Sequence, residues 1–280
     1  MKLLAGHLGR PLVRDGLTLL PVWNGVAVTR RGYDLHSQHL AVAERAGQPV
    51  VSELVVTNNR ARPTVVLAGE LLEDGQQHRV AARSTVVERG EAAVLDVRCV
   101  EEGRWSGDRT HRHSSRVAPV SVRGAADQIA VWNRVRHYEQ TYGTTATQSV
   151  LDATAAPDAA ARRLVSDLRP LAFQCGVLVG IGGQPLLLDV FDSPRTLTAV
   201  WRDLVQSAAL DAVTAPPLAT PGRRARRFLD RMITVPLEPG SGSTATVVGS
   251  EHVRLEALVW QGRAVHTVAT NIRHELVSAS

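Results

Sequence analysis

The densest run of polar side chains lies at residues 69–79, where the sequence is GELLEDGQQHR. It directly follows the apolar residues 65–68, so Glu70 is expected where a buried strand ends. Partial burial raises the pKa of a carboxyl group, which would suit Glu70 to act as a general base. Arg79 carries a planar fork that binds carboxylates and phosphates. The segment is therefore consistent with a catalytic site at the edge of a sheet. The alternative is a Glu70–Arg79 ion pair that closes a hairpin.

A second polar segment, CVEEGRW at residues 99–105, ends another apolar run. Glu101 supplies a second carboxylate, and Gln77 of the first segment supplies an amide that can orient a ligand. An arginine next to a tryptophan offers a planar ligand both a charge and a stacking surface, so Arg104 and Trp105 are candidate ligand contacts. The alternative is structural: Trp105 covers the edge of the core and Arg104 extends along it into solvent.

Asp108, His111 and His113 form a third candidate group. Two histidines separated by one residue lie on the same face of a strand, as metal ligands require. Arg112 stands between them, and serine, arginine and glycine surround them, which favours a solvated loop. We therefore assign no metal ligands. We also predict no cofactor, because the chain has no P-loop, no HExxH motif and no dinucleotide fingerprint.

The two cysteines, Cys99 and Cys175, each lie in an apolar stretch. A single disulfide would be a poor scaffold for 280 residues, and no CxxC or zinc-type spacing is present. The sequence therefore predicts two free, buried thiols.

The elements that must position these side chains are short strands. In the first hundred residues, β-branched runs alternate with turn residues, at 16–22, 49–57, 64–68, 79–87 and 92–100. This spacing is typical of a β-sandwich or a barrel. One helix is expected between them, capped by Ser37 and ended by Gly47. On this pattern residues 69–79 form a turn at a sheet edge. Because consecutive strands usually lie side by side, we expect both polar segments to meet at one pocket.

Helices dominate the middle of the chain, and strands return after it. Apolar spacing predicts a helix over 125–142 and another after Pro157. The buried stripe of the first helix is expected to contain Ile129, Trp132, Val135 and Tyr142. Gly182-Gly183 predicts a hairpin turn, and Ser193-Pro194 predicts the start of a helix that buries Trp201. We therefore predict an α+β fold with β-sandwich-like or barrel-like antiparallel sheets and several packed helices. We divide the chain into a mainly β region at 1–120 with both polar segments, a helical region at 121–170 and an α+β region at 171–280. The alternative is that all three regions form one continuous domain.

Composition excludes several classes of protein. Hydrophobic residues make up 44% of the chain, and no apolar run approaches the ~20 residues of a membrane helix. His7, Arg10 and Arg14 interrupt the first apolar run before a signal-peptide core forms, so we expect a soluble cytoplasmic protein. The net charge is +5, but the basic residues are spread along the chain and aromatics are only 4%, which argues against nucleic-acid binding.

With these motifs in place, the chain resembles the ARPP-1 family, a bacterial domain of uncharacterised activity. The residues that carry the resemblance are Ala68-Gly69-Glu70, Gly75, Gln77, Arg79, Cys99-Val100-Glu101, Gly103-Arg104-Trp105, Arg123, Gln128, Trp132, Phe191-Asp192-Ser193-Pro194 and Trp201. Gln76 departs from the pattern, because the family often has a lysine there. The family name implies a link by gene neighbourhood to ADP-ribosylglycohydrolase-type and phosphatase-type proteins, and hence to nucleotide metabolism.

Three functional hypotheses follow. In the first, the protein binds or hydrolyses a nucleotide-like or ADP-ribose-like anion. Arg79 and Arg104 would then hold phosphate, Trp105 would stack on a ring, and Glu70 would act as the base with Glu101 and Gln77 orienting. In the second, the chain is a non-catalytic interaction or scaffold module. Its helices at 125–168 and the basic residues at 223–227 would then face protein partners. In the third, it is a metal-dependent hydrolase that uses His111 and His113.

Overall fold

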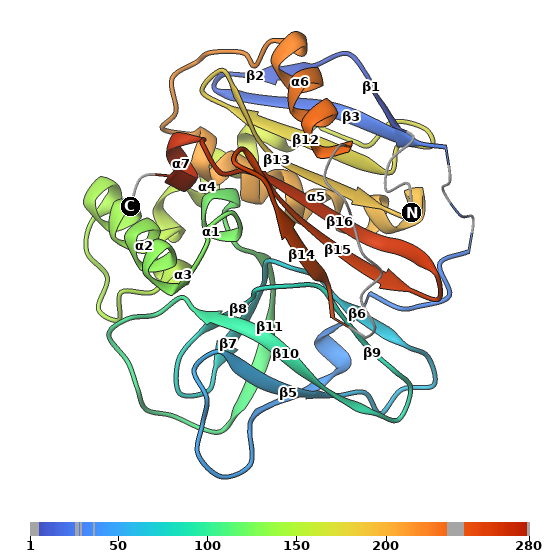
Figure 1. The fold of residues 1–280 in the computed structure, drawn as a ribbon. Coiled ribbons are helices and arrows are strands. Elements are labelled where there is room, and N and C mark those ends of the chain that lie inside the picture. Colours follow the sequence, from blue (N-terminus) through green and yellow to red (C-terminus); the bar gives the residue numbers. More distant parts are fainter. Residues whose placement is uncertain (1–5, 26–27, 29, 36, 234–243, 279–280) are drawn as a thin grey trace. The chain divides into compact units, whose positions relative to one another are not determined.

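A computed structural model describes residues 6–25, 28, 30–35, 37–233 and 244–278 (Figure 1). The chain forms two compact units, one of residues 32–158 and one that combines residues 1–31 with 159–279. We call them the barrel unit and the sheet unit. Both are built on antiparallel strands with packed helices, so the predicted α+β class is confirmed. The predicted regions divide the chain at 120 and 170, whereas the compact units group its first strands with its last third.

Six strands of the barrel unit close into a barrel in the order β10-β5-β4-β11-β7-β8. Their bounds are β4 (Ala41–Glu44), β5 (Glu53–Thr57), β7 (Glu70–Asp74), β8 (Arg79–Ala81), β10 (Ala92–Cys99) and β11 (Thr110–Val117). A separate hairpin pairs β6 (Thr64–Val66) with β9 (Thr85–Val87). Alternate residues of the barrel strands, such as Leu54 with Val56 and Leu95 with Val97, are buried in one cluster and form the barrel interior.

Helices cover one outer face of this barrel. They are α1 (Val120–Arg123), α2 (Gln128–Tyr142) and α3 (Val150–Ala153), and a 3-10 turn, η1 (Ser37–His39), precedes β4. Leu71 and Val80 alternate with the interior positions and pack with Val122, Val131 and Val135 of α1 and α2. Asp127 caps α2 by accepting a hydrogen bond from the Ala130 amide at 2.9 Å.

The sheet unit is an eight-stranded antiparallel sheet in the order β1-β3-β12-β13-β16-β15-β14, with β2 paired to β3. Its strands are β1 (Gly6–Leu8), β2 (Leu12–Arg14), β3 (Leu17–Asn24), β12 (Gly176–Ile181), β13 (Gln184–Phe191), β14 (Thr246–Gly249), β15 (Val253–Trp260) and β16 (Arg263–Asn271). Its helices are α5 (Pro194–Ala212), α6 (Gly222–Ile233), α7 (Glu275–Ser278) and most of α4 (Ala155–Val165). Phe228, Leu229 and Met232 of α6 pack on Leu178 and Leu188 of the sheet.

Local signals in this unit predicted the structure well. Gly182 and Gly183 have φ values of 57° and 84° and connect β12 to β13, as a tight hairpin requires. The Ser193 hydroxyl accepts from the Arg195 amide at 3.3 Å, with Pro194 in the first turn of α5. Trp201 is buried on α5 as predicted.

Three local predictions were wrong. The helix expected after Ser37 is only the η1 turn followed by β4, where Val42 and Glu44 are buried at a spacing of two residues. Residues 69–79 are not one turn, because 70–74 form β7. The segment around His111 and His113 is strand β11 with both rings buried, rather than a solvated loop.

The predicted buried stripe of α2 was misplaced in part. Val135 is buried as predicted, but Ile129 is 63% exposed, and Val131 and Tyr138 belong to the buried face. Within the described part of the chain, no helix combines the length and the apolar composition needed to cross a membrane.

Candidate functional site

The two polar segments meet because their strands are hydrogen-bonded neighbours. β8 and β10 are antiparallel with Arg79 opposite Cys99, so the residues before β8 and those after β10 leave the barrel side by side. The segment after β10 is held in turn by residues 147–150. The Gly103 amide donates to the Thr147 carbonyl at 3.0 Å, and the Val150 amide donates to the Val100 carbonyl at 2.9 Å.

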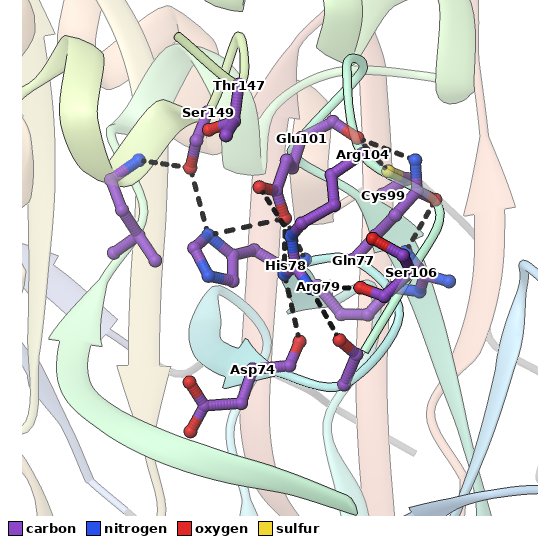
Figure 2. A network of polar contacts seen from close by, with 12 residues as sticks. Asp74, Gln77, His78, Arg79, Cys99, Glu101, Arg104, Ser106, Thr147 and Ser149 are labelled. Carbon is purple, nitrogen blue, oxygen red and sulfur yellow. Dashed lines mark hydrogen bonds and ion pairs between the residues drawn. The ribbon is translucent and has the colours of Figure 1, made fainter. Parts of the chain in front are cut away.

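Glu101 is the centre of this junction (Figure 2). Its side chain is 1% exposed. Oε1 accepts from Arg104 Nε at 2.9 Å, and Oε2 accepts from Arg104 Nη2 at 2.7 Å and from the His78 amide at 2.8 Å. Burial alone would raise the pKa of the Glu101 carboxyl, but the bonds from Arg104 and the His78 amide outweigh it and lower that pKa. Glu101 is therefore a buried, ionised carboxylate.

All five N–H groups of Arg104 donate hydrogen bonds to oxygen atoms of the protein. Besides the two bonds to Glu101, Nη1 donates to the carbonyls of Gly75 at 2.6 Å and Ser106 at 2.7 Å, and Nη2 donates to the carbonyl of Asp74 at 3.3 Å. A guanidinium has five N–H groups, and these five acceptors match them. The bond to Glu101 raises the pKa of Arg104. Arg104 is thus a structural clamp between the two polar segments, with no N–H left for a phosphate.

Arg79 points into the barrel and is 0% exposed. Nη1 donates to Gln77 Oε1 at 3.0 Å, and Gln77 Nε2 donates to the Glu101 carbonyl at 2.8 Å. The ring of Trp105, which is 52% exposed, lies 5.6 Å from Arg79 Cζ and covers the guanidinium in a cation–π contact. Trp105 therefore stacks on Arg79, which belongs to the barrel strand β8. Arg104, its neighbour in the sequence, lies in the segment that follows β10.

The buried charge of Arg79 has a carboxylate partner inside the barrel. Arg79 Nη2 is 3.9 Å from Glu44 Oε1, and the same oxygen is 3.1 Å from His111 Nε2. Burial is the main cause that lowers the pKa of Arg79 and also that of His111, against the raising effect of Glu44. Arg79 Nε, Glu44 Oε2 and His111 Nδ1 have no hydrogen-bond partner among the described residues.

Glu70 lies at the opposite end of β7 from the Asp74 turn. Its Oε2 accepts from Ser37 Oγ at 2.5 Å, its Oε1 accepts from the Leu67 amide at 2.8 Å, and His113 Nδ1 is 3.4 Å from Oε2. The sequence-predicted residues therefore gather in two places: Gln77, Arg79, Glu101, Arg104 and Trp105 are together, and Glu70 is in a separate hydrogen-bonded group.

An open cleft of about 420 Å³ adjoins the Glu101–Arg104 pair. Its walls are Asp74, Gly75, His78, Glu101, Arg104, Gly107, Asp108, Thr147 and Asp152. These residues carry four carboxylates and one guanidinium, so the cleft is acidic. Arg112, outside the lining, pairs with Asp74 at 3.1 Å.

His78 contributes an imidazole ring to the lining of this cleft. Its Nδ1 is 3.0 Å from Ser149 Oγ and 3.6 Å from Glu101 Oε2, which fixes the ring, and the side chain is 19% exposed. Its other nitrogen, Nε2, has no partner within the described ranges. Ser149 is fully buried and its Oγ also accepts from the Leu151 amide, so it orients His78 and caps α3.

Sequence reasoning passed over His78, Glu44 and Ser149. His78 lies inside the polar segment 69–79, so its neighbours were a usable signal. Glu44 was hidden by the wrong helix prediction, and Ser149 is brought to the site by pairing with residue 101, which leaves no local trace.

The barrel histidines do not assemble a metal site within the residues that the structure describes. No group of three or more His, Cys, Asp or Glu side chains there is arranged to hold a metal ion. His111 binds Glu44 and His113 approaches Glu70, so the two rings have different partners. Cys99 and Cys175 are free and buried, as predicted, and burial raises the pKa of both thiols.

Comparison with known proteins places the chain in one family. Searches of curated proteins and of solved structures find no match. A family model described as "ARG and Rhodanese-Phosphatase-superfamily-associated Protein domain" matches residues 6–270, which is nearly the whole chain. The resemblance carried by the two polar segments is therefore confirmed, and the chain belongs to the ARPP-1 family.

Proposed function

We propose that the acidic cleft of the barrel unit binds the ribosyl part of a nucleoside-like or ADP-ribose-like ligand, and that it hydrolyses the N-glycosidic bond. The observation that carries this proposal is the position of His78. Its ring borders the cleft, is fixed through Nδ1 by Ser149 and Glu101, and keeps Nε2 without a protein partner among the described residues. A fixed imidazole with one free nitrogen is suited to general acid–base catalysis.

The carboxylates of the cleft support a sugar ligand. Asp74, Asp108 and Asp152 accept hydrogen bonds only, and ribose hydroxyls are donors that match them. A volume of about 420 Å³ lies within the range of small-ligand sites. Carboxylates also stabilise the positive charge that develops on a sugar ring as its glycosidic bond breaks.

The same geometry argues against the predicted phosphate clamp. Arg104 donates all five N–H groups to protein oxygens, and Arg79 is buried inside the barrel beneath Trp105. Four carboxylates against one guanidinium repel a phosphate. In this proposal the cleft binds the sugar, and any phosphate of the ligand stays in solvent.

The reaction consumes one water molecule. His78 Nε2 accepts a proton from that water as its oxygen attacks the anomeric carbon and the C–N bond breaks. The same proton then passes from His78 to the leaving nitrogen, which returns the imidazole to its neutral form. The products are a free sugar hydroxyl and an N–H base. Glu101 acts as a positioning residue, because it holds the His78 backbone and Arg104 in place.

The test is thermal stabilisation and turnover with adenosine and ADP-ribose as probes. We expect the native protein to gain melting temperature with one of them. Asp152→Asn should abolish this rise in melting temperature. His78→Asn should keep the rise but lose release of the base. The control is His137→Asn at an exposed position, which should behave as the native protein does. Failure of both probes to stabilise the native protein, or equal activity of His78→Asn, would overturn the proposal.

A non-catalytic interaction module is the second candidate, and the saturated bonding of Arg104 favours it. In this interpretation, four side chains serve only to hold the polar segments together: Gln77, Arg79, Glu101 and Arg104. Substituting any of them should lower the stability of the protein, and no ligand should shift the melting temperature of the native protein. The same melting experiments separate the two candidates, because only the first gives a ligand-dependent shift.

A further inference from the structure

We infer that the sheet unit has a second binding site, in the cleft between the end of α4 and α5, for an organic anion with a compact apolar body. This inference is independent of the proposed function, because the whole cleft lies in the other unit. Its volume is about 490 Å³. Its walls are Arg162, Val165, Ser166, Leu168, Arg169, Pro170, Thr198, Trp201, Arg202, Val205 and Gln206.

The charge of the lining is one-sided. It contains three arginines and no aspartate or glutamate, in contrast to the acidic cleft of the barrel unit. Arg202 forms no hydrogen bond or ion pair with any residue that the structure describes, and it extends from α5 as an exposed side chain. An anion entering this cleft would meet unneutralised positive charge without first breaking a protein ion pair at Arg202.

A second arginine is already oriented by the loop that follows α4. Arg169 Nη1 donates to the carbonyls of Ser166 at 2.8 Å and Leu168 at 2.7 Å. These two bonds use one nitrogen and leave Nε and Nη2 without a hydrogen-bond partner among the described residues, while Asp167 of the same loop interacts electrostatically with the guanidinium. Because the guanidinium is held before a ligand arrives, little side-chain entropy is lost when it binds an anion.

The floor between these arginines is apolar. Val165, Leu168, Trp201 and Val205 are buried there, with exposed fractions between 2% and 7%. Trp201 Nε1 donates to the Leu168 carbonyl at 3.1 Å, so the indole is locked to the loop and offers the ligand carbon surface only. A purely inorganic anion would leave this surface wet, whereas an aryl or acyl carboxylate, phosphate or sulfonate would cover it.

The local sequence explains why the cleft persists. α4 ends at Val165, and the chain turns through Pro170 while Leu168 is fixed to α5 by Trp201. The sequence suggested a pairing of arginine and tryptophan as ligand contacts for Arg104 and Trp105. The same combination occurs here on the neighbouring residues Trp201 and Arg202, and the Arg202 guanidinium has no partner in the described part of the chain.

The test uses 1-anilinonaphthalene-8-sulfonate as the anionic probe, with the full chain in its native state. We expect saturable binding of one probe, with energy transfer from tryptophan. Arg202→Gln should weaken it at least tenfold without lowering the melting temperature, because Arg202 makes no hydrogen bond or ion pair with the residues that the structure describes. The matched control is Arg163→Gln, an exposed arginine of α4 outside the lining, which should bind as the native protein does.

Two further arms make the result decisive. The uncharged N-phenyl-1-naphthylamine has a similar apolar body and should bind at least tenfold more weakly if the arginines recognise charge. Displacement by phenyl phosphate or by benzoate then identifies which anionic group the site prefers. Absence of saturable binding, equal affinity of Arg202→Gln and native protein, or equal affinity for the uncharged probe would each overturn the inference.

Discussion

Glu101 and Arg104, three residues apart, bind each other through a fork in which Nε and Nη2 of the arginine reach the two carboxylate oxygens at 2.9 Å and 2.7 Å. Such two-point pairs are stronger and more directional than single ion pairs. Because Arg104 also binds the carbonyls of Gly75 and Asp74, the fork joins the end of β10 to the turn after β7. The strongest polar contact of the two motifs is therefore internal to the protein.

The first prediction concerns the loss of this carboxylate charge. Glu101→Gln leaves Arg104 with a weaker acceptor and removes the charge-assisted bond to the His78 amide. Since Arg104 is 24% exposed and partly screened by water, we expect a loss of about 2 kcal/mol in the free energy of unfolding, measured with urea. Glu102→Gln is the control, because Glu102 pairs with Arg136 at the surface and should cost less than about 0.5 kcal/mol. Equal losses in the two variants would contradict a structural role of the fork.

The second prediction concerns pH. The pKa of Glu101 is lowered in the folded protein, so near that pKa the unfolded chain binds more protons than the folded one. The stabilisation by Glu101 is therefore complete above the usual glutamate pKa of about 4.3 and is lost as the pH falls through the lower, folded value. The difference in unfolding free energy between native protein and Glu101→Gln should shrink as the pH is lowered from 5 to 3. A difference that stays constant over this range would show that Glu101 is not ionised in the folded state.

The third prediction concerns the buried pair of Arg79 and Glu44. Removing one partner leaves the other charge uncompensated inside the barrel, so Arg79→Met should cost about 3–5 kcal/mol. Combining it with Glu44→Gln removes both charges, and the double variant should be more stable than the sum of the single losses predicts. The surface pair of Arg83 and Asp96 gives the control cycle, with coupling near zero. Strictly additive losses for Arg79 and Glu44 would show that the two charges do not interact.

Parts of the fold that depend on neighbouring residues were predictable from the sequence. The turn at Gly182-Gly183 and the helix start at Ser193-Pro194 are determined by a few adjacent residues, so local patterns identified them. The meeting of Gln77 and Arg79 with Glu101 and Arg104 was also predictable, because the strands that carry them, β8 and β10, pair directly.

The predictions that were wrong concern residues whose structure depends on contacts between distant parts of the chain. Glu44 was assigned to a helix because the apolar residues Leu40, Ala43 and Ala46 have helical spacing, whereas closure of the barrel requires strand β4 there. His111 and His113 have polar neighbours in the sequence, but pairing of β11 with β4 and β7 turns both rings into the barrel. Glu70 was grouped with Arg79 because both lie in one polar segment, yet β7 separates them.

The last prediction concerns Gly75. This residue follows Asp74 in the turn after β7, and both have left-handed backbone, with φ values of 66° and 61°. A Cβ at position 75 would lie 2.1–2.6 Å from atoms of the His111 ring, so Gly75→Ala adds a clash inside the barrel to the backbone strain. Gly90 isolates the backbone strain, because it has a φ of 73° and no atom of the described residues lies within 4 Å of its added Cβ.

We expect Gly90→Ala to cost about 1 kcal/mol from strain alone, and Gly75→Ala to cost about 2 kcal/mol more, because His111 must move away from Glu44. Urea unfolding of both variants measures the difference. The histidine ring resonances give a second readout, since only Gly75→Ala should shift those of His111. If the two alanine variants lose the same stability and the His111 resonances do not move, the close packing of the Asp74–Gly75 turn on the barrel histidine is not a determinant of this fold.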